Sequence, residues 1–159
     1  MEEKEDDDEM YDRIIIQKEK YLNGEYEGEF KNGKREGKGK YIWENGSKYE
    51  GEFKNDSFDG RGIFIWQNGE KYEGNFKNGD KDGQGIYTYP SGSRYEGQFK
   101  DGKREGKGVF YYNSGNRYEG DFVKDKREGN GVMYYKNGDR EMGNYKNDKK
   151  VGKHINKIK

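Results

Sequence analysis

The sequence predicts an all-β protein, an antiparallel meander of consecutive 23-residue β-hairpins. Three observations support this prediction: a strict internal repeat, an alternation of glycine or aromatic residues with charged residues, and turn-forming residues between the alternating stretches. The composition alone argues the other way, because 27% hydrophobic and 40% charged residues with a mean hydropathy of −1.60 are typical of chains that lack a packed core. The arrangement of the residues therefore outweighs their average composition.

The repeat is defined by aromatic residues and glycines that recur every 23 positions. Its tyrosines are Tyr26, Tyr49, Tyr72, Tyr95 and Tyr118. A glycine follows each tyrosine after two positions, and a further aromatic series runs through Phe30, Phe53, Phe76, Phe99, Phe122 and Tyr145. A Gly-x-Gly pair and an aromatic run come next in each copy, beginning with Gly37 and Gly39. A fixed period of this length indicates that each copy is one supersecondary unit that packs against its neighbours.

Alternation with a period of two predicts two strands in each copy. In the first strand of the first copy, YEGEF, the residues on one face are Tyr26, Gly28 and Phe30. In the second strand, GKGKYIW, the residues predicted on the same face are Gly37, Gly39, Tyr41 and Trp43. The tip Asn32-Gly33 and its later equivalents tolerate the positive φ of a tight turn. Each copy is therefore a hairpin with an aromatic face and a mainly charged face.

Glycine weakens a strand unless its missing side chain is needed. We expect these glycines to make room for neighbouring aromatic rings, which lie over the bare backbone and form the core. A single hairpin buries too little surface to fold alone, so neighbouring hairpins must supply ladder hydrogen bonds and ring contacts.

The chain divides into four segments. Residues 1–12 contain the acidic run EEKEDDDE and are expected to form a flexible N-terminal tail. Residues 13–25 are interpreted as a half repeat that caps the array, and residues 26–153 as the array itself, with five good copies and a degenerate sixth. Residues 154–159, HINKIK, are expected to form a basic C-terminal cap whose lysines protect an exposed edge strand.

The pattern Tyr-x-Gly-x-Phe, followed by Gly-x-Gly with aromatic residues and then by Asn-Gly, closely resembles the MORN repeat (membrane occupation and recognition nexus). The resemblance covers residues 24–153. The final copy departs from the pattern, because Glu141 replaces the repeat tyrosine and His154 replaces the second glycine. The resemblance implies an elongated, twisted, single-layer antiparallel sheet with one grooved face lined by aromatic rings.

The resemblance also implies a scaffold or an interaction module. MORN arrays occur in cilia and radial spokes, in parasite cytoskeletons, in junctional membrane proteins, and beside the catalytic domains of lipid kinases and methyltransferases. Many self-associate, and some have been proposed to bind phosphoinositides. We therefore expect an intracellular protein of the cytoplasm or cytoskeleton, for example in a cilium or axoneme.

The residue inventory argues against an enzyme. The chain has one histidine, His154, and no cysteine, and its serines and carboxylates do not converge as a nucleophile with a base. No cofactor and no metal are expected, because His154 lacks neighbouring ligands and the acidic run lacks the spacing of a calcium loop. Nucleic acid is not expected as a partner, since 32 basic and 32 acidic residues cancel. No apolar run is long enough for a signal peptide or a transmembrane span.

The candidate binding site, for a peptide or helix of a protein partner, is the aromatic face. Its residues form two rows, an inner row of Tyr41, Phe64, Tyr87 and Phe110 and an outer row of Trp43, Trp66, Tyr89 and Tyr112. Contiguous exposed aromatic surface normally marks an interface. The competing interpretation is that these rings only fill the curvature of the sheet; it is favoured for the inner row and evenly balanced for the tryptophans.

The alternative function is a peripheral membrane adaptor that binds anionic phosphoinositides. Its candidate lipid contacts are basic residues at the hairpin tips, Lys34, Arg35, Lys103, Arg104, Lys126 and Arg127. An acidic residue follows each pair and cancels much of the local positive potential. Self-association through an edge strand, giving a homodimer, is compatible with either function.

Overall fold

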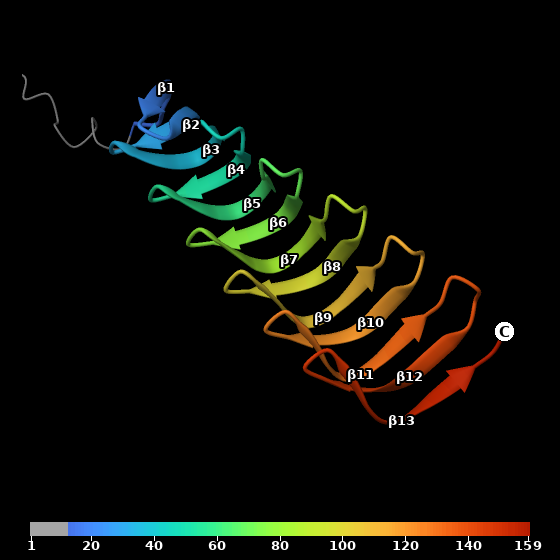
Figure 1. Cartoon of the computed structure of the whole chain (residues 1–159). Helices are drawn as coiled ribbons and strands as arrows, with labels where there is room; N and C mark the ends of the chain where they lie inside the picture. Colours follow the sequence, from blue (N-terminus) through green and yellow to red (C-terminus); the bar gives the residue numbers. More distant parts are fainter. Residues whose placement is uncertain (1–12) are drawn as a thin grey trace, which may run out of the picture.

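Thirteen strands form one continuous antiparallel sheet in the computed structural model, which describes residues 13–159 (Figure 1). Each strand pairs with the strands before and after it in the sequence, so β1 and β13 are the two edges. The described residues contain no helix. The sheet is open, elongated and one layer thick, which confirms the predicted fold class. The tail predicted for residues 1–12 lies outside the described residues.

The hairpins follow the sequence period. The strands are β1 (Ile15–Tyr21), β2 (Gly24–Lys31), β3 (Lys34–Trp43), β4 (Lys48–Lys54), β5 (Ser57–Ile65), β6 (Lys71–Lys77), β7 (Asp80–Thr88), β8 (Arg94–Lys100), β9 (Lys103–Tyr111), β10 (Arg117–Val123), β11 (Lys126–Tyr134), β12 (Arg140–Lys146) and β13 (Lys149–Lys157). The pair β2 and β3 is the first hairpin, and β12 and β13 form the sixth. A joint is the place where one hairpin meets the next.

Two-residue turns close the hairpin tips, as the sequence predicted. In the first hairpin φ is 52° at Asn32 and 73° at Gly33. Positive φ at both central residues is typical of a type I′ turn, whose twist matches that of the flanking strands. The second turn residue is an aspartate in three tips, at Asp56, Asp125 and Asp148, where φ is 67°, 70° and 68°. A side chain is strained in this conformation, so these tips need compensating contacts.

A β-bulge in the second strand of each hairpin corrects the predicted alternation. In the first hairpin the register shifts between Gly28 and Phe30 of β2, where β3 carries extra residues. Gly37 lies in this bulge with a φ of 71°, and a Cβ atom there would meet the side chain of Glu29. Gly37 therefore faces the charged side of the sheet, and its predicted place on the aromatic face was wrong. The bulge needs a left-handed backbone, which glycine adopts at low cost.

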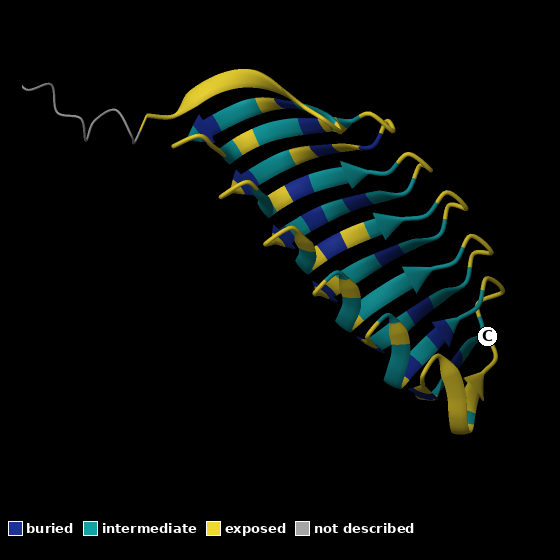
Figure 2. Cartoon of the chain, turned by 60° about the vertical axis from the view of Figure 1, so that its left-hand side comes forward, coloured by how far each residue is buried: buried dark blue, intermediate teal, exposed yellow. Residues whose placement is uncertain are grey.

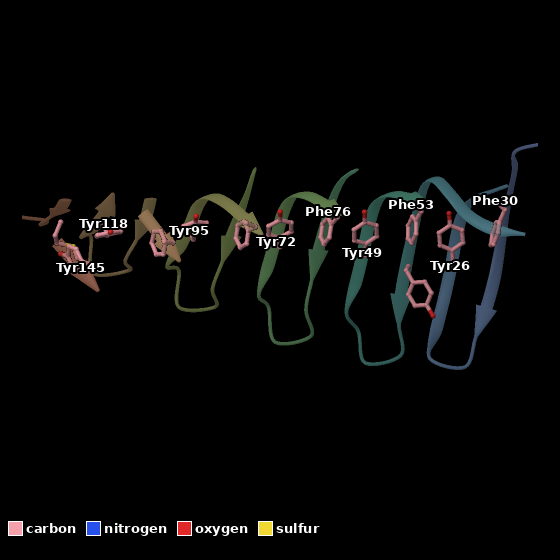
Figure 3. Close-up of a cluster of buried hydrophobic side chains, with 13 residues drawn as sticks. Tyr26, Phe30, Tyr49, Phe53, Tyr72, Phe76, Tyr95, Tyr118 and Tyr145 are labelled. Carbon is pink, nitrogen blue, oxygen red and sulfur yellow. The ribbon is translucent and has the colours of Figure 1, made fainter. Parts of the chain in front are cut away.

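The core is a continuous herringbone of aromatic rings along one face of the sheet (Figure 3). Each repeat tyrosine meets two rings edge-on, one in its own hairpin and one in the next. The ring of Tyr49, for example, lies 5.1 Å from that of Phe53 and 5.2 Å from that of Phe76, with interplanar angles of 88° in both pairs. Edge-to-face packing is a favourable geometry for aromatic pairs. The herringbone therefore binds each hairpin to its neighbour.

The predicted role of the glycines is confirmed at these tyrosines. A Cβ atom on Gly62 would lie only 2.4 to 2.6 Å from three atoms of the Tyr49 side chain. The hydroxyl of Tyr49 then donates a hydrogen bond to the carbonyl oxygen of Glu52, at 2.7 Å. In the first hairpin, burial raises the pKa of Tyr26 to about 12, which favours the protonated hydroxyl that donates to the carbonyl oxygen of Glu29.

The sixth hairpin keeps this geometry with different residues. The imidazole of His154 covers Gly143, and its Nε2 lies 2.9 Å from the carbonyl oxygen of Asn144. In the second hairpin the equivalent carbonyl, that of Glu52, accepts from a tyrosine hydroxyl. The carboxylate of Glu141 lies 3.0 Å from Nδ1 of the same imidazole. Glu141 thus takes the position of the repeat tyrosine, and His154 takes that of the second glycine. The ring that covers the remaining glycine now comes from the second strand, and its bond to the backbone is retained.

Buried residues lie along the middle of the sheet, whereas the tips and both edge strands are exposed (Figure 2). β1 is exposed along its whole length. β13 runs without interruption past position 153, so HINKIK begins inside a strand and is not a separate element. On the charged face the register places Glu27 opposite Lys40, and Lys107 pairs with Asp121 at 3.5 Å. Exposed ion pairs of this kind contribute little stability individually.

Candidate functional site

The eight aromatic residues predicted as a binding site lie in one continuous line of rings across the first four hairpins. Neighbouring ring centroids along this line are 4.4 to 5.9 Å apart. Tyr21 of β1 extends the line by one ring, which the sequence analysis missed because Tyr21 does not fit the 23-residue period. We call this line the aromatic ribbon; its members in order are Tyr21, Tyr41, Trp43, Phe64, Trp66, Tyr87, Tyr89, Phe110 and Tyr112.

The aromatic ribbon is both a border of the core and a surface. Tyr41 is 4% exposed and belongs to the core, whereas Tyr21 is 38% exposed. The other rings of the ribbon are half-buried, with Trp43 and Trp66 packed against the herringbone on one side. Tyr41 therefore fills the core, whereas the remaining rings keep exposed surface that a partner can contact.

Hydrogen bonds hold two rings of the ribbon in place. The hydroxyl of Tyr41 donates to Oδ1 of Asn23 at 2.5 Å, and that of Tyr87 donates to Oε2 of Glu70 at 2.8 Å. Burial, with Glu70 beside the ring, raises the pKa of Tyr87. Side chains that are already fixed lose little conformational entropy when a partner binds.

An arginine joins the first hairpin to the tip of the second, a contact the sequence analysis missed. The backbone N–H and Nε of Arg35 donate to Oδ1 of Asp56 at 2.8 and 3.2 Å, and Nη2 donates to the Asp56 carbonyl oxygen at 3.0 Å. The N–H of Asp56 donates in return to the carbonyl oxygen of Arg35 at 3.0 Å. The guanidinium also lies 5.5 Å from the ring centroid of Tyr41 and 5.7 Å from that of Phe53. We call this arrangement a clamp.

Two further joints carry the same clamp, formed by Arg104 with Asp125 and by Arg127 with Asp148. In all three clamps the arginine side chain is only 19 to 22% exposed. The bonds engage the carboxylate and the backbone of an aspartate that is strained by its positive φ. A clamp therefore offsets the strain of the tip and ties it to the preceding hairpin with charge-assisted hydrogen bonds.

The sequence contains a signal for the clamps. Among the five joints between the six hairpins, an arginine at the start of the second strand is followed 21 residues later by an aspartate wherever a clamp exists. At the other two joints the corresponding residues are Phe58 with Gly79 and Lys81 with Gly102. At the second turn position an aspartate is strained by its positive φ and a glycine is not. The restriction of aspartate at that position to joints with an arginine therefore predicts a contact between the two.

The six candidate lipid contacts fall into two groups. The clamp arginines turn towards the aromatic face and are engaged by aspartates, whereas the neighbouring lysines are exposed beside the tips. The acidic residues that follow them also have structural contacts; Oε2 of Glu36, for example, accepts the N–H of Asn55 at 2.9 Å. The arginines are Arg35, Arg104 and Arg127, and the lysines are Lys34, Lys103 and Lys126.

Two hollows open beside the aromatic ribbon. One of about 410 Å³ is lined by Trp43, Phe58 and Gly79, among others. The other, of about 250 Å³, contains Lys81 and Gly102. Each hollow reaches from a glycine tip to an adjoining clamp, since the first is also lined by Arg35 and Asp56 and the second by Arg104 and Asp125. The missing side chain at the glycine tip leaves one side of each hollow open on the aromatic face.

Two kinds of feature are absent from the part of the chain that the structure describes. Within residues 13–159, no group of three or more histidine, aspartate or glutamate side chains is arranged to hold a metal ion. Over the same part of the chain, no helix has the length and apolar character needed to cross a membrane. What the aromatic face presents is a row of rings with cations set among them.

Comparison with protein-family models finds five consecutive MORN repeats, at residues 26–48, 49–71, 72–94, 95–117 and 118–140. No curated protein matches the sequence significantly. Among solved structures, a similar chain is the SAS-4 (dCPAP) TCP domain of Drosophila melanogaster, in complex with a proline-rich motif of Ana2 (dSTIL). It is 14% identical, with 92% of this chain and 89% of that chain covered and a TM-score of 0.47. Because the MORN matches span most of the sequence and coincide with the hairpins, the chain belongs to the MORN repeat family.

Proposed function

We propose that the protein is a non-enzymatic scaffold that binds a peptide or helix of a partner protein along the aromatic ribbon. The observation that carries this proposal is the ribbon itself, a continuous line of mostly half-buried rings on one side of a single sheet. Rigid aromatic side chains provide large contact area at a small entropic cost and are common in binding hot spots. Family membership adds support, since MORN arrays are interaction modules.

We further propose that the protein acts inside the cell, in a cytoskeletal or ciliary assembly such as a radial spoke of the axoneme. The support for this is the range of assemblies in which MORN arrays occur. Fluorescence imaging of the tagged full-length protein in ciliated cells, with an axonemal marker, tests it. A signal that spreads evenly through the cytoplasm and avoids the axoneme would contradict the ciliary location.

Replacing Trp43 and Trp66 together by alanine tests the binding site. The matched control replaces Ile42 and Ile86, which are 43% and 41% exposed on the opposite face. Native complexes of the two variants and the wild type are compared by quantitative mass spectrometry. We expect proteins retained by the wild type and by the control to be lost from the tryptophan variant, whose circular dichroism and cooperative unfolding persist. Unchanged complexes would rule out the ribbon as the binding site.

Phosphoinositide binding remains the alternative proposal, carried by Lys34, Lys103 and Lys126, because the neighbouring arginines are engaged in clamps. Flotation with vesicles of phosphatidylcholine, with and without phosphatidylinositol bisphosphate, tests it at physiological salt. Recovery in the floating fraction only with the anionic lipid, and its loss when the three lysines are replaced by glutamine, would support it. Absence of flotation would remove it.

Self-association is the third part of the proposal. Both edge strands expose apolar side chains: Ile16 of β1 is 79% exposed, and Ile155 of β13 is 59% exposed. An unpaired edge strand can add a strand from a second copy. Multi-angle light scattering measures the oligomeric state, and a monomeric mass at high protein concentration would exclude the homodimer.

A further inference from the structure

The joint between the third and fourth hairpins has the cation of a clamp but lacks the carboxylate. Lys81 stands where the other clamps have arginine, and Gly102 stands where they have aspartate. The backbone contact is unchanged, because the N–H of Gly102 donates to the carbonyl oxygen of Lys81 at 2.9 Å. The φ of Gly102 is 81°, and a Cβ atom there would meet no heavy atom within 4 Å. The space that a tip aspartate would use is therefore open.

The ammonium group of Lys81 is surrounded by aromatic rings. Its Nζ lies 4.7 Å from the ring centroid of Tyr87 and 5.6 Å from those of Trp66 and Phe99. Within residues 13–159, the side chain of Lys81 forms no hydrogen bond and no ion pair. The rings attract the cation, but they do not replace the hydrogen bonds that it loses on leaving water.

Three carboxylates act on this ammonium group, namely Asp125, Glu70 and, most weakly, Asp80, and the first two are engaged elsewhere. Asp125 is held by the clamp of Arg104, and Glu70 accepts the hydroxyl of Tyr87. Burial is the largest influence on Lys81 and lowers its pKa, although the fields of Asp125 and Glu70 act in the opposite direction. The charge is therefore incompletely compensated, and an additional carboxylate would stabilise it.

The neighbouring joint provides an internal contrast. Its tip also has a glycine, Gly79, but the clamp position holds Phe58, whose ring stacks on Tyr49 at 3.9 Å. The one cation that lines the hollow at this joint is Arg35, and it is already paired with Asp56 in a clamp. Only at Lys81 do a cage of rings, a cation without an ion-pair partner in the described chain, and an open aspartate position coincide.

We propose that a carboxylate side chain of the partner's peptide binds in this hollow, in the place of the missing tip aspartate, and pairs with Lys81. The inference rests on the proposed function and specifies it further. Trp66 and Tyr87 belong both to the cage and to the aromatic ribbon, so a peptide lying on the ribbon passes directly over the hollow. The partner's segment is thereby identified as one in which an aspartate or glutamate is flanked by apolar residues.

Selection of random linear peptides on the full-length protein tests the proposal. We expect the selected peptides to carry an aspartate or glutamate at a constant distance from apolar residues. Peptides with the matching amide, asparagine or glutamine, should bind about tenfold more weakly. Lys81→Met should abolish this difference, and so should Gly102→Asp, which supplies the carboxylate from within. Lys100→Met, which removes an exposed lysine of the fourth hairpin, is the matched control and should leave it unchanged.

The outcomes separate this inference from the proposed function. Peptides that require Trp43 and Trp66 but show no preference for an acidic residue, or keep it in Lys81→Met, would overturn the inference alone. Failure to select any peptide that depends on the two tryptophans would overturn both. The selection is repeated on a chain whose acidic residues in 2–9 are replaced by amides. A preference for acidic peptides found only there would overturn the proposal in favour of the chain's own acidic run as the occupant.

Discussion

The joints at the centre of the sheet differ from those nearer its ends. The joints between hairpins one and two, four and five, and five and six carry clamps, whereas the two central joints carry none. The herringbone is the same at both kinds of joint, since Tyr72 lies 5.0 Å from Phe99 at a central joint and Tyr95 lies 5.1 Å from Phe122 at a clamped one. The difference is therefore confined to one pair of side chains and the tip that it stabilises.

The turn at the hairpin tip has one backbone conformation, and the chain stabilises it in two ways. A glycine tip adopts positive φ without strain but leaves its side of the joint open. An aspartate tip is strained, and an arginine offsets the strain while closing the joint. Each hollow beside the aromatic ribbon reaches from a glycine tip to the clamp of an adjoining joint. The clamp adds stability on one side of the hollow, and the glycine tip leaves space for a partner on the other.

The largest expected effect comes from removing a core ring at a central joint. Tyr72→Ala should lower the free energy of unfolding by about 3–5 kcal/mol, because a fully buried ring is lost. No clamp holds that joint, so the two halves should unfold in separate transitions. Fluorescence of Trp43 and Trp66 reports the first half, and circular dichroism reports the whole sheet, during urea denaturation.

Tyr95→Ala is the matched control at a clamped joint. It should cost a similar amount but preserve a single transition, since Arg104 and Asp125 still couple the hairpins. Coincident fluorescence and circular dichroism curves for both variants would show that the clamps do not control cooperativity.

The second effect comes from opening a clamp. Asp125→Gly removes hydrogen bonds to a charged group, which contribute about 1.5–3 kcal/mol, and relieves strain of about 1 kcal/mol. A net loss of about 0.5–2 kcal/mol in the free energy of unfolding should follow. In a double-mutant cycle, Arg104→Met should then add little in the Asp125→Gly background. Additive effects of the two substitutions would refute the coupling.

The third effect comes from building a clamp at a central joint. Lys81→Arg combined with Gly102→Asp should raise the free energy of unfolding by about 1 kcal/mol. Gly79→Asp, placed opposite Phe58, should lower it by about 1 kcal/mol, because no cation offsets the strain of the new aspartate. Both changes are measured by urea denaturation. Destabilisation by the first substitution as well would show that the central joint does not fit a clamp.

The smallest effect concerns the sixth hairpin, where ion pairs replace the repeat tyrosine. Hydrogen bonds from Lys150 and Tyr135 lower the pKa of Glu141 from its ordinary value of 4.5. A lowered folded-state pKa stabilises the fold above the unfolded-state pKa, and this contribution is lost as the pH falls through the folded-state value. The wild type should therefore lose more stability than Glu141→Gln below about pH 4.5, by less than about 1 kcal/mol. Parallel melting temperatures of the two proteins across this range would contradict it.

The fold class, the register of the repeats and the function of the glycines that the repeat tyrosines cover were predictable. A period of 23 residues sets tyrosine and glycine at constant spacing, and only a ring lying over bare backbone makes that pairing favourable. The positions of the rings in the aromatic ribbon were predicted except for that of Tyr21. This ring was missed because β1 precedes the first full copy and carries no periodic pattern. Whether the ribbon binds a partner stays a prediction.

The bulge and the clamps required the tertiary structure. Strict alternation placed Gly37 on the aromatic face, and the bulge that turns it away follows from how β2 and β3 pair. The residues of a clamp are 21 positions apart on different hairpins, and whether they meet depends on the position of a tip relative to the strand beside it. Local patterns determine which residues lie on each face, since side-chain direction follows from the strand period. Contacts between hairpins depend on register and twist, which emerge only when the whole sheet is assembled.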